Sequence, residues 1–318
     1  MFPFRNILLP TDFSPHSHAA VKYAAGLARN NRGRVVLLNV QDAPVPPNLL
    51  TLPSYVFEEQ QNTWLQELRS RAQYWLADPL FNGVEVEALF VNGEPPHEIA
   101  RVAFENESDL ITLVMRARNR LSRAFGGSIT EDIVAESPCP VLVIRVPQRE
   151  FVEHREGKTH IRLNRVLLAT NFRPSSAAAT QLANSVANHV GAELHAVYVI
   201  GDYYEQISAV FPEGGLGALT RLRSHVQDCL SQLTNTFGPK VSTHIAEGRP
   251  YQEIVKLAAS LDADLIVIGT AVHGSLFGGN QVLGSEIERV IRNAPCPVLC
   301  VPAAKAVTPL PALVTQAV

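Results

Sequence analysis

The most constraining feature of the sequence is a repeat that spans almost its whole length. Four short motifs of the first half return in the second half in the same order, each 155 to 159 positions later. One example is SPCPVLV at residues 137–143, which returns as APCPVLC at residues 294–300. Self-similarity at a fixed spacing indicates that one structural unit occurs twice. We therefore expect two homologous domains, residues 1–147 and 164–303, joined by a charged linker, residues 148–163, and followed by a tail, residues 304–318.

Each copy alternates short apolar runs with segments whose apolar residues recur at helical spacing. In the first copy the runs cover residues 7–9, 35–40, 84–90, 110–114 and 141–146, and Ser14-Pro15 has the form of a helix start. In the second copy they cover residues 166–169, 194–199, 241–245, 265–268 and 298–301. Apolar strands separated by amphipathic helices are typical of a parallel sheet that helices cover on both faces. The sequence therefore predicts an α/β protein with two tandem doubly wound parallel-sheet domains, each Rossmann-like.

Composition narrows the partners and the compartment of the chain. Its 318 residues carry a formal net charge of −3, whereas a nucleic-acid-binding protein usually has a basic excess. The sequence has no uncharged apolar run long enough for a membrane helix, and its N-terminus lacks the layout of a signal peptide. The four cysteines do not form a disulfide framework. We expect a cytoplasmic protein that binds neither nucleic acid nor membrane.

Glycines mark a candidate anion site after the fourth apolar run of the second copy. Gly269 and Gly274 follow that run, and Gly284-Ser285 stands where the next helix is expected to begin. Glycine permits a close approach of the backbone to an anion, and the free N–H groups of a helix start attract phosphate. An alternative is that these glycines only form tight turns. The segment lacks the lysine of a P-loop, so a P-loop NTPase is rejected.

Taken together, these motifs resemble those of the universal stress protein family. The run PTDFS at residues 10–14 is similar to the end of the first strand in that family. The spacing from Gly274 to Gly284-Ser285 is similar to its phosphate loop, although the gap between Gly269 and Gly274 is two residues longer. The likeness covers nearly all of residues 1–303. It implies adenine nucleotide alpha-hydrolase-like domains that bind ATP, with ADP or AMP as alternatives and with or without Mg²⁺.

The resemblance also implies which residues hold the nucleotide. In the family, the ends of the first two strands hold the ribose and the adenine, and the glycine loop holds the phosphates. Carried over by position, the assignment falls on Asp12 and Val40 in the first copy, and on Asn171, Val199, Gly269, His273, Gly274, Gly284 and Ser285 in the second copy.

The two copies keep different parts of this motif. The first copy retains Asp12, but its loop has Val114 and Ala117, whose side chains would obstruct the close approach that phosphates need. The second copy retains its glycines and has Asn171, which still accepts a hydrogen bond from a hydroxyl but carries no charge. We therefore expect the nucleotide site mainly in the second copy.

The sequence offers no motif for catalysis or metal binding. His16 and His18 lack a third ligand, and we find neither a nucleophile elbow nor a pair of carboxylates suited to hydrolysis. We expect no catalytic residue, no metal site and at most slow ATP hydrolysis. The resemblance implies a regulatory role in the stress response; an interaction scaffold with decayed pockets and a weak ATPase remain alternatives. It also implies that the halves pack as a pseudo-dimer through residues 141–146 and 298–301, and that two chains can form a homodimer.

Overall fold

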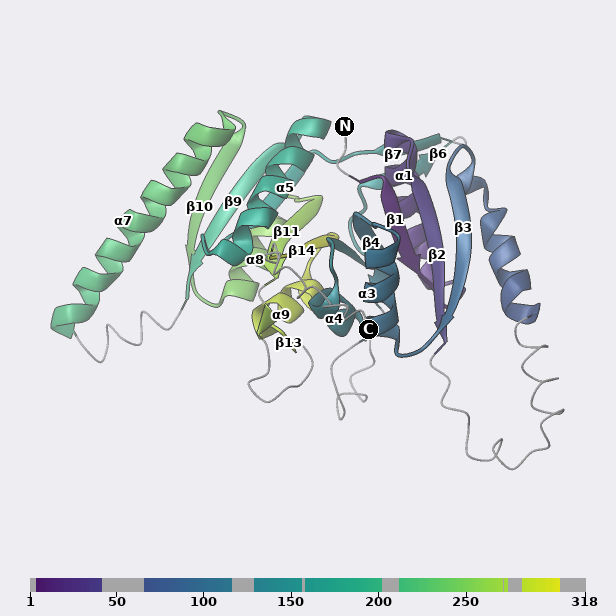
Figure 1. Ribbon diagram of the computed structural model, residues 1–318. Helices are drawn as coiled ribbons and strands as arrows, with labels where there is room; N and C mark the ends of the chain where they lie inside the picture. The colour runs from purple at the N-terminus through teal and green to yellow at the C-terminus, as the bar shows by residue number, and fades with distance from the viewer. Residues whose placement is uncertain are drawn as a thin grey trace, which may run out of the picture.

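Both halves of the chain contribute to one continuous sheet of ten strands (Figure 1). The computed structural model describes residues 4–41, 66–115, 129–155, 158–201, 212–270, 272–273 and 282–303. The strand order is β10-β9-β8-β11-β14-β5-β4-β1-β2-β3. The first half supplies β1 (Asn6–Pro10), β2 (Arg34–Gln41), β3 (Glu85–Asn92), β4 (Leu110–Met115) and β5 (Val141–Arg145). The second half supplies β8 (Arg165–Ala169), β9 (Glu193–Ile200), β10 (Val241–Glu247), β11 (Leu265–Thr270) and β14 (Val298–Pro302).

Helices cover the sheet on both faces, as predicted for a doubly wound fold. One face packs against α1 (Val21–Asn31), a helix over residues 66–76, α5 (Pro174–Val190) and α7 (Pro212–Phe237). The other packs against α3 (Pro95–Glu105), α4 (Ile129–Glu136), α8 (Pro250–Ser260) and α9 (Ser285–Asn293). Successive strand residues point to opposite faces of the sheet. Ile7 and Leu9 therefore enter the core beneath α1 and α5, and Leu8 enters the core beneath α3 and α8. Each core contains residues of both halves.

The two halves meet where β5 and β14 pair. This pairing is antiparallel, with Leu299 opposite Leu142 and Cys300 opposite Val141, whereas all other pairings within the ten-stranded sheet are parallel. Each half is thus a five-stranded parallel sheet, and the last strand of each half forms the joint. The structure agrees here with the expected pseudo-dimer of the two halves.

The segment expected to be a charged linker contains a β-hairpin. Its strands are β6 (Val152–Arg155) and β7 (Lys158–Ile161), and they pair antiparallel. Phe151 is fully buried, and its ring contacts Tyr23 of α1 edge to face with the centroids 5.1 Å apart. The prediction of a charged linker did not include this buried contact, because a single aromatic residue among charged neighbours gives no periodic signal.

The helix predicted to begin at Ser14-Pro15 begins later. A 3-10 helix, η1 (Ser17–Ala20), precedes α1, which begins at Val21. Asp12 Oδ1 accepts hydrogen bonds from the Ser14 N–H (3.0 Å) and from the Ser17 hydroxyl. The side chain of Asp12 thus stabilises a turn where the sequence pattern predicted a helix. In the second half, α5 does begin at Pro174, which aligns with Pro15.

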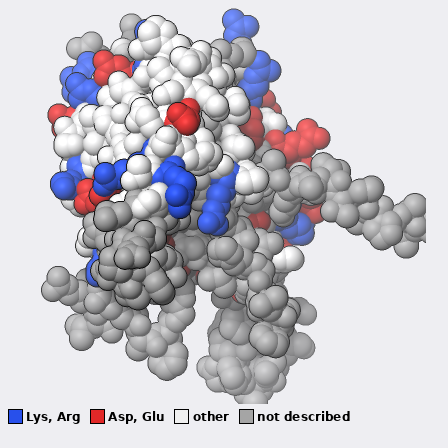
Figure 2. Space-filling model, turned by 90° about the vertical axis from the view of Figure 1, so that its left-hand side faces the viewer, with Lys and Arg blue, Asp and Glu red and all other residues white. Residues whose placement is uncertain are grey.

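The face at the α7 end of the molecule carries few charged side chains. Figure 2 shows that the upper part of this face is mostly uncharged, with one acidic side chain near its middle and several Lys or Arg side chains along its lower part. Among the described helices, none has the length and apolar character needed to cross a bilayer.

Candidate functional site

The first strand of each half ends in the same turn. Phe13 and Phe172 both adopt left-handed backbone conformations, with φ of 55° and 56°. The N–H of Phe13 donates to Thr11 Oγ1 at 2.9 Å, and that of Phe172 donates to Thr170 Oγ1 at 3.2 Å. A non-glycine residue in this conformation is uncommon and needs support from its surroundings. The repeat therefore preserves a strained turn at the carboxyl end of both sheets.

In the second half this turn borders a hollow of about 250 Å³. Three of the predicted nucleotide-binding residues line it together: Asn171 from the turn, Val199 from β9 and Gly269 from β11. The Oδ1 atom of Asn171 accepts a hydrogen bond from the Arg173 N–H at 3.0 Å. The hollow lies at the carboxyl ends of parallel strands, where open α/β sheets bind their ligands.

Gly269 lies against the start of α5. A Cβ atom at this position would lie 2.6 Å from the carbonyl oxygen of Ser175 and 2.9 Å from the Cα of Ser176. Both distances are far below van der Waals contact, so any other residue would push the helix away. The close packing of α5 on β11 therefore requires glycine at this position, whether or not Gly269 also contacts a ligand.

The start of α9 lies at the same edge of the sheet. Gly284 is its N-cap residue, with φ −63° and ψ 135°, and as a glycine it has no side chain that could cap the helix. Ser285 is the first helical residue and is exposed. An uncapped helix start leaves backbone N–H groups for an anion.

Glu286 lines this hollow, although the sequence patterns did not single it out. Its carboxylate accepts a hydrogen bond from the Tyr251 N–H at 2.9 Å and lies 3.2 Å from Arg289 Nη1. Its position directly after Gly284-Ser285 is the signal that could have found it. The negative charge of Glu286 interacts favourably with the dipole at the start of α9. It repels an anion that enters the hollow without a cation.

Two further predicted residues belong to the loop between β11 and α9. The backbone of His273 forms β12 (Val272–His273), which pairs antiparallel with β13 (Val282–Leu283). Gly274 lies outside the described residues. The structure thus places Asn171, Val199 and Gly269 in one hollow with the α9 start beside it.

The first half has an equivalent hollow of about 410 Å³. Asp12 and Val40 both line it, as predicted, and so does Val114. Val114 aligns with Gly269, so a side chain stands where the second half has none. In the first half, the segment after the strand forms a turn and η1 before α1 begins. Gly269 lets α5 begin close to its strand, whereas in the first half the Asp12 side chain stabilises a turn before η1.

Cysteines and metal-binding groups add little chemistry to these sites. Cys139 and Cys296 are buried, and burial raises the pKa of each thiol to about 12, so neither is a thiolate near neutral pH. The described part of the chain holds no cluster of three or more His, Cys, Asp or Glu side chains that could bind a metal ion.

Comparison with known proteins places the chain in a family. The model of the universal stress protein family matches twice, over residues 3–145 and 162–302. A universal stress protein of Methanocaldococcus jannaschii is 33% identical over 152 residues, which is 46% of this chain and 85% of that protein. One of Thermus aquaticus is 33% identical over 144 residues, covering 45% of this chain and 99% of that protein.

A solved structure shares the two-domain architecture. The crystal structure of a universal stress protein from Archaeoglobus fulgidus matches with a TM-score of 0.62 and 23% identity, covering 94% of this chain and 98% of that one. At this identity the likeness shows the fold alone, and it extends over both halves. The two family matches account for most of the sequence, and the chain therefore belongs to the universal stress protein family, with two domains of that family in tandem.

Proposed function

We propose that this protein is an adenine-nucleotide-binding regulator of the stress response and that it binds ATP mainly in its second domain. The supporting observation is the hollow lined by Asn171, Val199 and Gly269, with the uncapped start of α9 beside it. The free N–H groups of α9 suit phosphate oxygens. The polar Asn171 and the apolar Val199 at the strand ends suit a ribose hydroxyl and a base, respectively.

Glu286 favours a magnesium-bound nucleotide over the free anion. A carboxylate is a common ligand of Mg²⁺, which is usually held by one or two carboxylates together with phosphates. Without a cation, the charge of Glu286 in the hollow would repel a triphosphate. We therefore propose ATP with Mg²⁺ as the ligand of this site, with ADP and AMP as weaker alternatives because they carry fewer phosphate contacts for α9.

A substitution at Gly284 tests the site without disturbing the fold. Among the described residues, a Cβ at Gly284 would meet the Cδ1 atom of Ile287 alone, at an ordinary 3.8 Å, and Asp and Asn are both good N-cap residues. Gly284→Asp places a negative charge at the phosphate position, whereas Gly284→Asn is its neutral match. We expect Gly284→Asp to weaken ATP binding at least tenfold more than Gly284→Asn does, which is about 1.4 kcal/mol, because both side chains cap the helix and only the aspartate adds a charge. Isothermal titration calorimetry in the presence of Mg²⁺ measures both.

The matched change in the first domain is Gly127→Asp, at the position that aligns with Gly284. It should leave ATP binding unchanged. Loss of binding in Gly127→Asp with full binding in Gly284→Asp would move the site to the first domain. Absence of ATP binding to the unsubstituted protein would reject nucleotide binding and favour the interaction scaffold.

A further inference from the structure

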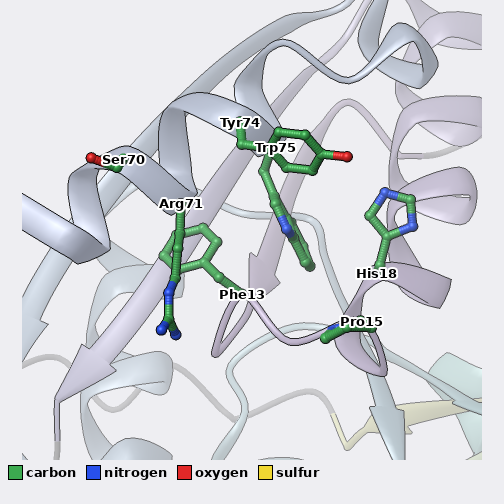
Figure 3. Close-up of a pocket in the computed structure, with 7 residues that line it drawn as sticks. All are labelled: Phe13, Pro15, His18, Ser70, Arg71, Tyr74 and Trp75. Carbon is green, nitrogen blue, oxygen red and sulfur yellow. The ribbon is translucent and has the colours of Figure 1, made fainter.

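A separate hollow of about 550 Å³ lies on the other face of the first domain. It is lined by Phe13, Pro15, His18, Ser70, Arg71, Tyr74 and Trp75 (Figure 3). None of these residues lines the crevice that contains Asp12 and Val40. Phe13 and Trp75 belong to the core beneath α1, whereas Ile99 and Ile133 of the crevice belong to the core of the opposite face. The hollow is therefore distinct from the proposed nucleotide site, and the Thr11–Phe13 turn separates the two.

Aromatic rings form the walls of this hollow. The indole of Trp75 is held by two edge-to-face contacts, with Phe13 at 5.4 Å and with His18 at 5.2 Å between ring centroids. Figure 3 shows Trp75 between these two rings, with Tyr74 next to it on the same helix. Tyr74 is 77% exposed, whereas Trp75 is only 4% exposed. The face available to a flat ring is therefore that of the exposed Tyr74 phenol, next to the Trp75 indole.

Two polar groups of the hollow, one positively charged and one a neutral donor, have no partner among the described residues. His18 Nε2 lies 2.6 Å from Asp78 Oδ2, and Asp78 Oδ1 accepts a hydrogen bond from the Leu80 N–H, so this carboxylate is already engaged. Arg71, in contrast, makes no hydrogen bond or ion pair with any residue in the described part of the chain. The indole N–H of the buried Trp75 likewise has no acceptor among the described residues. Both groups suit an anionic oxygen.

We propose that this hollow binds a planar aromatic carboxylate. The aromatic ring of the ligand stacks on the exposed phenol of Tyr74, and its carboxylate pairs with the fork of the Arg71 guanidinium. A volume of this size lies in the ordinary range for small-molecule sites and accommodates one or two fused rings.

The second domain does not repeat this arrangement. Ala177 aligns with His18, and Phe172, the counterpart of Phe13, stacks on Tyr198 with the centroids 5.8 Å apart and the planes 10° from parallel. Both tryptophans of the chain lie in the first half, so the second domain lacks the Phe–Trp–His arrangement that bounds the hollow. One aromatic anion is expected per chain.

Calorimetry with 2-naphthoate and its neutral match 2-naphthamide tests the proposal on the full-length protein. We expect one 2-naphthoate per chain and an at least tenfold weaker affinity in Arg71→Ala, with 2-naphthamide binding unaffected by that change. Arg69→Ala is the control, because Arg69 is exposed on the same helix and does not line the hollow. Saturation with ATP should not displace 2-naphthoate. Equal affinity in Arg71→Ala, an equal loss in Arg69→Ala, or competition with ATP would each overturn the proposal.

Nuclear magnetic resonance locates the bound ring. The chain has two tryptophans, Trp64 and Trp75, so Trp64→Phe leaves a single indole N–H signal. We expect 2-naphthoate to shift this signal in the Trp64→Phe protein, and the shift to saturate with the affinity measured by calorimetry. An indole signal that does not move while heat is released would place the ligand elsewhere and reject the site.

Discussion

At the residue scale, the two halves differ most at the position occupied by Gly269 in one and Val114 in the other. The glycine was expected to approach a phosphate, and the structure gives it a further reason. Its missing side chain lets Ser175 and Ser176 of α5 pack directly on β11. A residue that a motif assigns to a ligand can thus be required by packing, and only a measurement of stability separates the two roles.

We expect Gly269→Ala to destabilise the protein by about 1–3 kcal/mol, because the added Cβ meets backbone atoms that cannot rotate away. Gly201→Ala is the control: its Cβ would meet no atom of the described residues within 4 Å, and it follows a strand of the same domain. That change should be neutral or slightly stabilising. Urea denaturation followed by circular dichroism measures both. A Gly269→Ala protein as stable as the Gly201→Ala protein would contradict the packing argument.

At the element scale, the hairpin formed by β6 and β7 acts as a cover for α1. A Cβ at Gly26 would lie 2.8 Å from Thr159 Cγ2 and 3.0 Å from Val152 Cγ1, so the hairpin packs directly on the helix backbone. The Thr159 hydroxyl also accepts a hydrogen bond from Arg29 Nη1 at 2.5 Å. The segment that connects the two domains is therefore attached to the first domain through α1.

This contact can be tested with Gly26→Ala in two backgrounds. Alanine favours an α-helix over glycine by about 1 kcal/mol, but in the unsubstituted protein the clash with the Thr159 methyl should cancel or reverse that gain. In the Thr159→Ser background the methyl is absent and the hydroxyl is kept. We expect Gly26→Ala to be more favourable there by about 1 kcal/mol, measured as the free energy of unfolding. The same effect in both backgrounds would show that the Thr159 methyl does not press on α1.

At the scale of the whole molecule, the two domains share a sheet and both hydrophobic cores. Next to the β5–β14 joint, Arg292 of α9 forms an ion pair with Glu131 of α4. The side chain of Glu131 is only 3% exposed, whereas that of Arg292 is 43% exposed. Removing one partner of a buried pair leaves an uncompensated charge, which costs more than the pair itself contributes.

We expect Arg292→Ala to destabilise the protein by about 3 kcal/mol, because it removes a guanidinium group that balances the charge of the buried Glu131 carboxylate. Adding Glu131→Gln should recover most of this loss, since the amide carries no charge. Differential scanning calorimetry of the two proteins measures the loss and the recovery. If Glu131→Gln brings no recovery, the cost of Arg292→Ala arises from lost packing at the joint and not from charge.

The sequence by itself determined the duplication, the α/β class, the family and most strand positions, because hydrophobic periodicity and short motifs are local properties. It also placed Asp12 and Val40 at the strand ends of the first half, and Asn171, Val199 and Gly269 at those of the second half, where each five-stranded parallel sheet has its hollow. Only the tertiary structure decided that the hairpin covers α1 and that Glu286 lines the hollow of the second domain. It also brought Phe13 into contact with Trp75. These contacts join residues far apart in the chain, and they depend on how helices pack on the sheet, which no local pattern records.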